Sequence, residues 1–475
     1  MKIGVSLLQG MIMKLLKTFF LLCLPLSGFS QIYDTDMLSK DFHKGRREAI
    51  RKFLPNNTCA VIFAGAERQR ANDTKFIYHQ DPNFYYLTGL TEPNAMLIIF
   101  KEEQTFYDSI KTNELIFVQD RDAAKESWIG KILGKEGVAT KLGFSTVLIN
   151  KQFADFKIDF EKLDKVYHLE FNDDVRDDKN NKGDLYSLIK HFRSKTTNTA
   201  TNCDNITLAG WLATLREIKQ PEELVLMRKA IDMTCMAHNE IMKALEPEMK
   251  EYQAQAVVEY MFKHQGSEYV GYPSIVGGGE NSCILHYETN RKKLVGLDLL
   301  VIDAGAEYHG YTADVTRTLP VDGKFSAQEK IIYNIVLEAQ EAGIKACVPG
   351  AEFRAAHKAA VAVIQKGLLD NGIINNSIDF LEYFFHGTSH YLGLDVHDPG
   401  SYGKLIPGSI ITVEPGIYIP AGSKCDPMWW NIGIRIEDDV LITTGDPEVL
   451  SAKSPKKIEE IEALMKEESL FNKIK

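Results

Sequence analysis

The sequence has few cysteines and lacks any paired cysteine motif. Seven cysteines are scattered over 475 residues, and no two of them form a CxxC pair. This argues against a structural zinc site built from thiolates, which draws on closely spaced cysteine pairs. With 44% hydrophobic residues, a chain of this length can build large cores without disulfides. We therefore expect the six cysteines that follow Cys23 to be free thiols.

The sequence also lacks an excess of basic residues and a phosphate-binding loop. Lys and Arg number 55 against 65 Asp and Glu, so the formal net charge is −10. Nucleic-acid binders usually present a basic face, and this class is therefore disfavoured. The glycine run at residues 277–279 has neither the lysine nor the hydroxyl residue of a P-loop. Internal repeats and low-complexity segments are absent as well.

A membrane-length apolar run is missing, although the N-terminus contains a short one. Residues 1–31 contain no Asp or Glu, and their charges come from three lysines. The apolar residues 18–26 follow the last lysine, and small polar residues come next. This order is typical of a secretory signal peptide, and the run is shorter than the roughly 20 residues that span a bilayer. We predict a signal peptide over residues 1–31, export to the periplasm or the medium, and no stable membrane association.

The rest of the chain divides at a polar stretch. Residues 172–184 are almost wholly polar and predict a solvated loop. Strand-like and helical runs alternate before it, which predicts a smaller α/β domain at residues 32–205. After it, Pro221 begins a long pattern of apolar residues at intervals of three and four, typical of a helix. We predict an α+β domain at residues 206–475, where helices flank antiparallel strands.

Acidic residues adjoin three apolar, strand-like runs of this second domain. Asp303 follows the run LLVI, Glu414 follows IITV, and Glu437 follows IRI. Burying a carboxylate is costly unless a partner neutralises it, and few basic residues are near these three. We therefore predict that the three acids bind a cation.

Two more residues complete the candidate metal set. Asp314 and His390 lie in similar apolar segments. Hard divalent ions prefer carboxylate oxygen with some imidazole. Four carboxylates and one histidine are too many ligands for one open site, and they suit two ions about 3.5–4 Å apart that share bridging carboxylates. The predicted metal ligands are Asp303, Asp314, His390, Glu414 and Glu437.

In this arrangement the sequence resembles the pita-bread metallopeptidase family, which includes methionine aminopeptidase, prolidase and aminopeptidase P. The family order is Asp, Asp, His, Glu, Glu, and its two aspartates are spaced as Asp303 and Asp314 are. The strings HGTSHYLGLDVHD and SCILHYETN resemble aminopeptidase P, and DPNFYYLTGLTEPNAML resembles the N-terminal domain of that group. The resemblance implies a pita-bread (creatinase/aminopeptidase) catalytic domain preceded by a smaller α/β domain.

The resemblance also implies how the ligands are shared. Asp303 binds one ion, Asp314 and Glu437 bridge two ions, and His390 and Glu414 complete the second. Two divalent ions per chain, expected to be Mn²⁺, hold a hydroxide that attacks the peptide bond. Glu414 moves a proton from water to the leaving nitrogen.

Five further residues receive roles from the resemblance. His286 and His397 hydrogen-bond the substrate and stabilise the tetrahedral intermediate. Arg435 lies two residues before Glu437, on the same strand face, and orients an acid of the site. His386 and Tyr418 are expected in the substrate pocket. Without the resemblance, His286 would be read as an ordinary strand histidine.

The predicted function is that of a metal-dependent aminopeptidase that releases the N-terminal residue when proline stands second. No Lys or Arg occurs between His397 and Lys404, so the sequence shows no obvious clamp for the carboxylate of a dipeptide. Prolidase, a dipeptidase with the same five ligands, stays open as an alternative. So does a catalytically dead peptide-binding module, although none of the ligands is lost. Expected partners are proline-containing peptides and further copies of the chain, in a homodimer or homotetramer.

Overall fold

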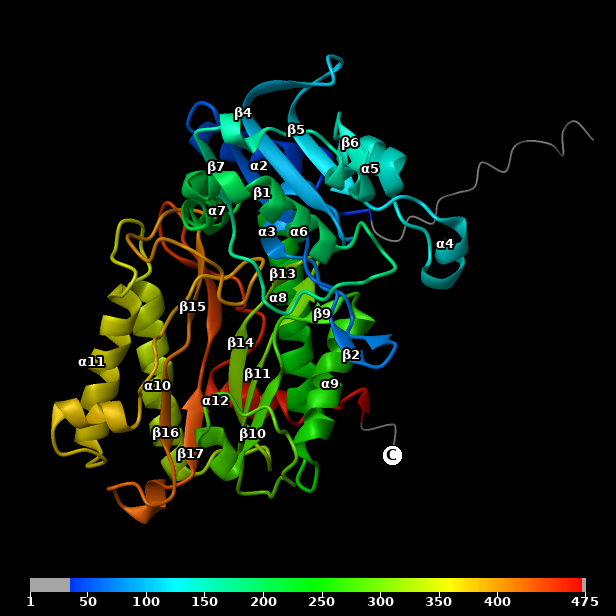
Figure 1. The fold of residues 1–475 in the computed structure, drawn as a ribbon. Helices are drawn as coiled ribbons and strands as arrows, with labels where there is room; N and C mark the ends of the chain where they lie inside the picture. Colours follow the sequence, from blue (N-terminus) through cyan, green and yellow to red (C-terminus); the bar gives the residue numbers. More distant parts are fainter. Residues whose placement is uncertain (1–34, 472–475) are drawn as a thin grey trace, which may run out of the picture. The chain divides into compact units, whose positions relative to one another are not determined.

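The computed structural model describes residues 35–471 (Figure 1). The predicted signal peptide, residues 1–31, lies outside the described residues and stays a prediction. The chain from Leu38 onward clusters as one compact unit, described below as residues 38–205 and 206–471. No helix among residues 35–471 combines the length and the apolar character needed to cross a membrane.

Residues 38–205 contain a six-stranded sheet with helices on both faces. Its strands are β1 (Thr58–Phe63), β4 (Met96–Phe106), β5 (Ile110–Val118), β6 (Val147–Ile149), β7 (Lys165–His168) and β8 (Cys203–Asp204), beside a small hairpin of β2 (Gln69–Ala71) and β3 (Thr74–Lys75). The helices are α2 (Lys40–Phe53), α3 (Pro82–Thr88), α4 (Ala123–Ile129), α5 (Gly134–Leu142) and α6 (Leu185–Lys195), with the 3-10 turns η1 (Asn150–Ala154), η2 (Phe160–Lys162) and η3 (Thr197–Asn202). The sheet order is β6-β5-β4-β1-β7-β8, in which β4 is antiparallel to both neighbours and the other pairs are parallel.

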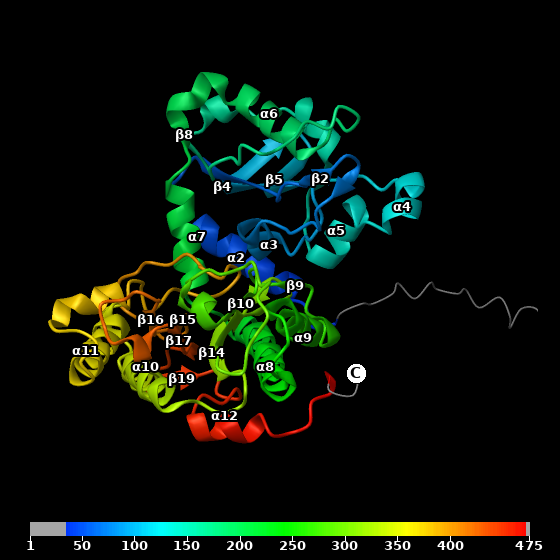
Figure 2. The same ribbon diagram turned by 90° about the horizontal axis from the view of Figure 1, so that it is seen from below.

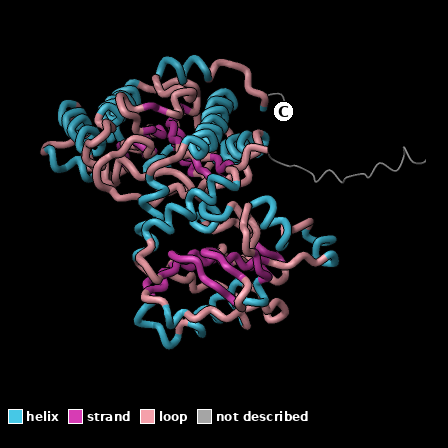
Figure 3. Tube along the Cα trace, turned by 90° about the horizontal axis from the view of Figure 1, so that it is seen from above, coloured by secondary structure: helices cyan, strands magenta, loops and turns pink. Residues whose placement is uncertain are grey.

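Alternating side chains of these strands enter two separate cores. In β1, Ala60 and Ile62 join the core that includes α2 and α3, whereas Cys59 and Val61 join the core that includes α6. This is the two-residue period of a strand that is buried on both faces. Figures 2 and 3 show helices on both sides of the sheet. The predicted α/β character of the first region is confirmed.

Residues 206–471 begin with α7 (Thr207–Glu217), the connection between the two regions. The other helices are α8 (Pro221–Ala244), α9 (Glu251–His264), α10 (Ala327–Lys345), α11 (Ala355–Asp370) and α12 (Ile458–Leu464), with the 3-10 turns η4 (Gly279–Cys283), η5 (Ser377–Glu382) and η6 (Pro427–Trp429). The strands are β9 (Tyr269–Val270), β10 (Ile275–Gly278), β11 (Leu299–Ala304), β12 (Ala306–Tyr308), β13 (Tyr311–Thr312), β14 (Val315–Pro320), β15 (Ile410–Val413), β16 (Gly416–Ile419), β17 (Ile432–Arg435), β18 (Asp438–Leu441) and β19 (Glu448–Val449).

Short antiparallel sheets lie between two helix pairs in this region. The sheets have the orders β10-β11-β14, β13-β12-β9, β15-β18-β19 and β16-β17. Helices α8 and α9 lie on one side of the strands and α10 and α11 on the other (Figure 1). The predicted α+β character is confirmed.

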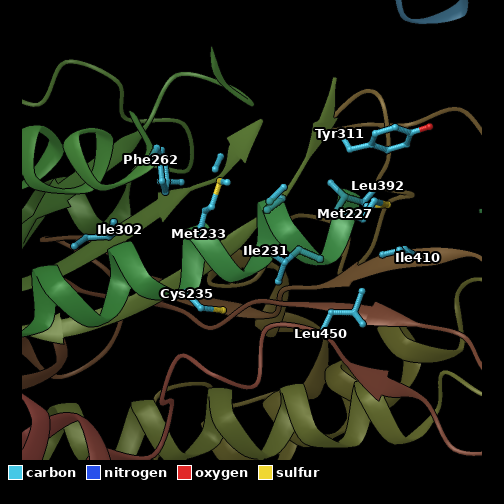
Figure 4. Close-up of a cluster of buried hydrophobic side chains, with 14 of the residues drawn as sticks. Met227, Ile231, Met233, Cys235, Phe262, Ile302, Tyr311, Leu392, Ile410 and Leu450 are labelled. Atoms are coloured by element: carbon cyan, nitrogen blue, oxygen red, sulfur yellow. The ribbon is translucent and has the colours of Figure 1, made fainter. Parts of the chain in front are cut away.

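Helix α8 forms where its sequence pattern predicts it. Pro221 stands at its first turn, and Glu222 and Glu223 lie at the positive end of its dipole. Its apolar stripe is buried and the helix packs against β12, β13 and β14, while Met227 belongs to the same core cluster as Leu392 and Ile410 (Figure 4). The hydrophobic core of this region therefore packs against strands that carry or adjoin acidic residues.

Two predicted strands are interrupted beside their acidic residues. The chain of residues 410–419 breaks at Glu414 and Pro415, because proline has no N–H for the ladder. The chain of residues 432–441 breaks at Ile436 and Glu437, and the Glu437 N–H donates instead to the Thr316 carbonyl of β14. Both glutamates therefore leave their ladders and can turn toward a common space. The six described cysteines are free thiols, as predicted.

Candidate active site and metal centre

A cavity of about 410 Å³ lies among the strands of the second region. It is lined by Tyr272, Pro273, Ile275, Leu285, His286, Glu288, Asp303, Asp314, His386, Gly387, Ser389, His390, Val396, His397, Glu414, Arg435 and Glu437. All five predicted metal ligands are in this set, together with four of the five other predicted site residues. The exception, Tyr418, is fully buried and lies behind the wall, with its hydroxyl 3.0 Å from His386 Nε2.

Close strand packing brings the two aspartates together. Asp303 lies in β11 opposite Thr316, and Asp314 directly precedes β14. Between them, Gly305 passes so near the Ala313 carbonyl oxygen that a Cβ would lie 1.7 Å from it. Glycine at this position allows the close backbone approach.

Three of the predicted ligands form a compact group. Asp314, His390 and Glu437 each offer a ligand atom, and these atoms lie within 4.8 Å of one another. The His390 Nε2 atom is 3.4 Å from Asp314 Oδ2 and 3.6 Å from Glu414 Oε1. These separations exceed a good hydrogen bond, and they suit ligands that surround a divalent ion at about 2.0–2.2 Å each.

Asp303 is held by two partners at the edge of this group. Its Oδ2 atom accepts a hydrogen bond from Arg435 Nη2 at 2.6 Å. Its Oδ1 atom is 2.6 Å from the Tyr272 hydroxyl, which also lies 2.5 Å from Asp314 Oδ1. A hydroxyl has one proton and can donate to only one of two carboxylates at a time. The second carboxylate oxygen therefore needs another positive partner.

The pKa shifts of the clustered acids also indicate a cation site. Burial raises the pKa of Glu414 to about 7, with His390 opposing the rise and Asp314 adding to it. Burial, then Asp314 and Glu414, raise the pKa of Glu437 well above its ordinary range. For His390, burial lowers the pKa, but Asp314 and Glu414 outweigh it and bring the value to about 9. Carboxylates that raise one another's pKa in this way are too many for their protein cations, and divalent ions fit this donor set.

Histidines form the other wall of the cavity. The rings of His390 and His397 lie 4.3 Å apart in an edge contact. Burial, followed by the neighbouring His390 and His286, lowers the pKa of His397. Burial and Arg435 lower the pKa of His386 to about 3. His397 and His386 are therefore neutral near pH 7, with one ring N–H each. His397 can present its N–H to a ligand, whereas His386 donates its own from Nδ1 to the Gly387 carbonyl at 2.7 Å.

Three contacts around the metal-ligand group were not predicted from the sequence. Tyr272 joins the two aspartates, and the Thr316 hydroxyl donates to Glu437 Oε2 at 2.6 Å. The buried Asp439 accepts a hydrogen bond from the Asp314 N–H at 3.2 Å. The two-residue strand period places Thr316 on the same face as Asp314 and could have indicated it. Tyr272 and Asp439 carry no such local signal.

Comparison with known proteins agrees with this geometry. The model of Metallopeptidase family M24 matches residues 225–444, and that of the aminopeptidase P N-terminal domain matches residues 43–167. The Xaa-Pro aminopeptidase of Escherichia coli (strain K12) is 38% identical over 90% of this chain and 98% of that protein. The chain belongs to metallopeptidase family M24. The cavity therefore lies in the catalytic region of a hydrolase that depends on divalent metal ions.

Further comparisons confirm the fold expected of this M24 member. The Xaa-Pro aminopeptidase of Haemophilus influenzae is 35% identical over 90% of this chain and 98% of its own. The structure of aminopeptidase P from E. coli with the inhibitor Pro-Leu has a TM-score of 0.81 at 34% identity, covering 90% of this chain and 98% of that one. The pita-bread catalytic region and the aminopeptidase P type of N-terminal region are both as predicted.

Proposed function

We propose that the chain is an aminopeptidase that releases the N-terminal residue of peptides whose second residue is proline. The observation that carries this proposal is the convergence of four carboxylates and His390 on one cavity of about 410 Å³. It is supported by M24 membership and by relatives named Xaa-Pro aminopeptidase over nearly their whole length.

Two divalent ions would be held by Asp303, Asp314, His390, Glu414 and Glu437. Manganese is the proposed native metal, because hard carboxylate oxygens dominate the donor set and no cysteine is among the described residues that line the cavity. When bound, such a pair lowers the pKa of a water molecule and polarises the carbonyl of the scissile bond.

Side chains around the metal site would complete the reaction. Glu414 lines the cavity, with its Oε1 atom 3.6 Å from His390 Nε2, so its carboxylate would accept a proton from the attacking water and pass it to the leaving nitrogen. His397, neutral for the reasons given above, and His286 would donate hydrogen bonds to the substrate carbonyl oxygen, where negative charge develops. Arg435 keeps Asp303 in a fixed orientation through its 2.6 Å contact.

The cavity favours peptides longer than a dipeptide. A dipeptidase needs a cation for the free carboxylate of its substrate. Among the described residues that line the cavity, Arg435 is the only Lys or Arg. Its guanidinium is already engaged with Asp303 and with the Tyr418 hydroxyl. The space beyond a bound proline therefore offers no evident carboxylate clamp.

The test compares kcat/KM for an Xaa-Pro dipeptide with that for the same dipeptide extended by two residues, with Mn²⁺ added. We expect the extended peptide to be cleaved and a matched Xaa-Ala peptide to be a poor substrate. Chelation should abolish the activity, and elemental analysis should return two divalent ions per chain. Turnover of the dipeptide alone would identify a prolidase instead. No turnover of any of these peptides by the metal-loaded protein would refute the proposal.

A further inference from the structure

A buried ion cluster ties the end of α7 to the segment that carries His390 and His397. Arg216 is the penultimate residue of α7, and its guanidinium donates to Asp398 Oδ1 at 2.5 Å and to Asp395 Oδ2 at 2.7 Å. Lys219 donates to Asp398 Oδ2 at 2.8 Å. The side chains of Arg216, Lys219 and Asp398 are at most 2% exposed. Both oxygens of the Asp398 carboxylate are thus bound by buried cations.

A second contact of α7 holds the same segment. Glu217 accepts hydrogen bonds from the Tyr391 hydroxyl at 3.0 Å and from the Ser401 N–H at 2.8 Å. Tyr391 and Asp398 also pair through a backbone bridge, in which the Asp398 N–H donates to the Tyr391 carbonyl at 2.9 Å. Both ends of the segment are therefore bound by three polar residues of the connection, at positions 216, 217 and 219.

The residues next to Tyr391 and Asp398 are two of the histidines that line the cavity. His390 precedes Tyr391 and His397 precedes Asp398, so the bridge between the clamped residues sets the histidines side by side at 4.3 Å. The first region of the molecule also takes part, because Arg216 donates to Asn83 of α3 at 2.8 Å. The backbone that presents the histidines is thus fixed from the connection between the regions.

We propose that Asp398, held by Arg216 and Lys219, is a positioning residue that aims His397 into the active-site cavity. The inference rests on the proposed function, in which His397 contacts the substrate. Asp398 itself does not line the cavity, so its effect on the reaction passes through its neighbour. Misplacing a substrate-binding group by about 1 Å can cost on the order of 100-fold in rate.

The test is a double-mutant cycle of Asp398→Asn and His397→Ala, measured as kcat/KM on the extended Xaa-Pro peptide. In the wild-type background, Asp398→Asn should lower kcat/KM by about 100-fold. In the His397→Ala background the same substitution should lower it by less than about 3-fold, because the effects of two coupled residues on the activation free energy do not add. An equal fold-loss of kcat/KM in both backgrounds would overturn the proposal, because a substitution that only reduces the amount of folded protein lowers kcat/KM by the same factor in each. Metal content is checked in every variant.

Glu114 supplies a matched control for the loss of a buried, doubly paired carboxylate. It lies between the buried Arg47, at 2.9 Å, and Arg51, at 3.2 Å, in the first region. Glu114→Gln should reduce thermal stability as Asp398→Asn does and leave kcat/KM unchanged. An equal loss of kcat/KM in Glu114→Gln would also overturn the proposal.

Two further measurements cover a variant that folds poorly and a failure of the proposed function. Tyr391→Phe removes only the hydroxyl that binds Glu217, and it should give a smaller loss that again disappears in His397→Ala. If the wild type cleaves none of the peptides, the proposed function fails. A crystal structure of Asp398→Asn then still tests the positioning: we expect the His397 ring to leave its contact with His390, and an unchanged ring would contradict it.

Discussion

Glu437 and Asp438 are neighbours in the chain and both are buried, yet their side chains have different surroundings. Glu437 lines the cavity, and Asp438 lies in a cluster of ion pairs. Asp438 points into an ion cluster, where it accepts hydrogen bonds from Arg317 at 2.8 Å and Lys456 at 2.6 Å. Although burial raises the pKa of Asp438, Arg317 and Lys456 outweigh it and lower the value. Glu437 points into the cavity, where burial and three further acids, Asp314, Glu414 and Asp303, raise its pKa.

The difference separates structural from functional carboxylates. Glu114 and Asp398, like Asp438, each have two cationic partners within 3.2 Å. The cavity gathers the four carboxylates of the candidate metal site around Arg435 and His390, so their charge is balanced only when cations bind. A buried carboxylate with its own cations stabilises the fold, whereas a group of carboxylates without enough of them is a cation site.

Replacing Glu414 should give the largest effect, because it would act on the reacting atoms. We expect Glu414→Ala to lower kcat by about 100-fold to 10 000-fold, the usual contribution of a general acid–base group, and by more if a metal ion is lost as well. Steady-state kinetics and metal analysis on the folded variant measure it. Glu382→Ala is the control, because Glu382 is exposed and forms an ion pair with the exposed Lys424. A folded Glu414→Ala enzyme with wild-type kcat would refute the role.

The sequence was sufficient to predict helix α8 and to propose five candidate ligands, all of which line one cavity. Their signals are local: apolar stripes predict α8, and acids that adjoin apolar runs mark Asp303, Glu414 and Glu437. These cues need no knowledge of which segments meet. The breaks of the strands beside Glu414 and Glu437 were not predicted, although Pro415 was a local sign of the first.

The supporting contacts could not be predicted, because they join distant parts of the chain. Arg216 and Asp398 are 182 residues apart, and Thr316 and Glu437 are 121 residues apart. Neither pair shares a pattern in the sequence. Tyr272 likewise reaches its aspartates only through the packing of the strands. Such contacts depend on the tertiary arrangement and become visible only in the structure.

Two substitutions of adjacent residues should change the stability of the metal-free protein in opposite directions. Asp438→Asn leaves the buried Arg317 without its carboxylate partner and should lower the free energy of unfolding by about 3–5 kcal/mol. Glu437→Gln removes one of several repelling acids, and we expect it to raise the free energy of unfolding by about 1 kcal/mol, the worth of roughly one pKa unit.

Denaturant unfolding after exhaustive chelation measures both variants against the wild type. The Glu437→Gln protein should also bind less metal, as elemental analysis would show, whereas Asp438→Asn should keep its ions at temperatures where it is folded. A destabilised metal-free Glu437→Gln protein would mean that Glu437 is a structural carboxylate like Asp438. The distinction between the cavity and the cluster of ion pairs would then fail.

The smallest effect concerns pH. In the metal-free folded protein the pKa of Glu414 is raised from 4.5 to about 7 and that of His390 from 6.5 to about 9. Between about pH 4.5 and 9 the folded state therefore binds more protons than the unfolded state, and its stability must fall as pH rises. Bound ions displace these protons, so the metal-loaded protein should lack this dependence. We expect the difference in Tm between loaded and metal-free protein to grow by a few degrees from pH 5.5 to 8.5, as scanning calorimetry can measure. Comparing the two forms at each pH cancels the titration of the rest of the chain. A Tm difference that stays constant or shrinks as pH rises would contradict the raised pKa values of Glu414 and His390.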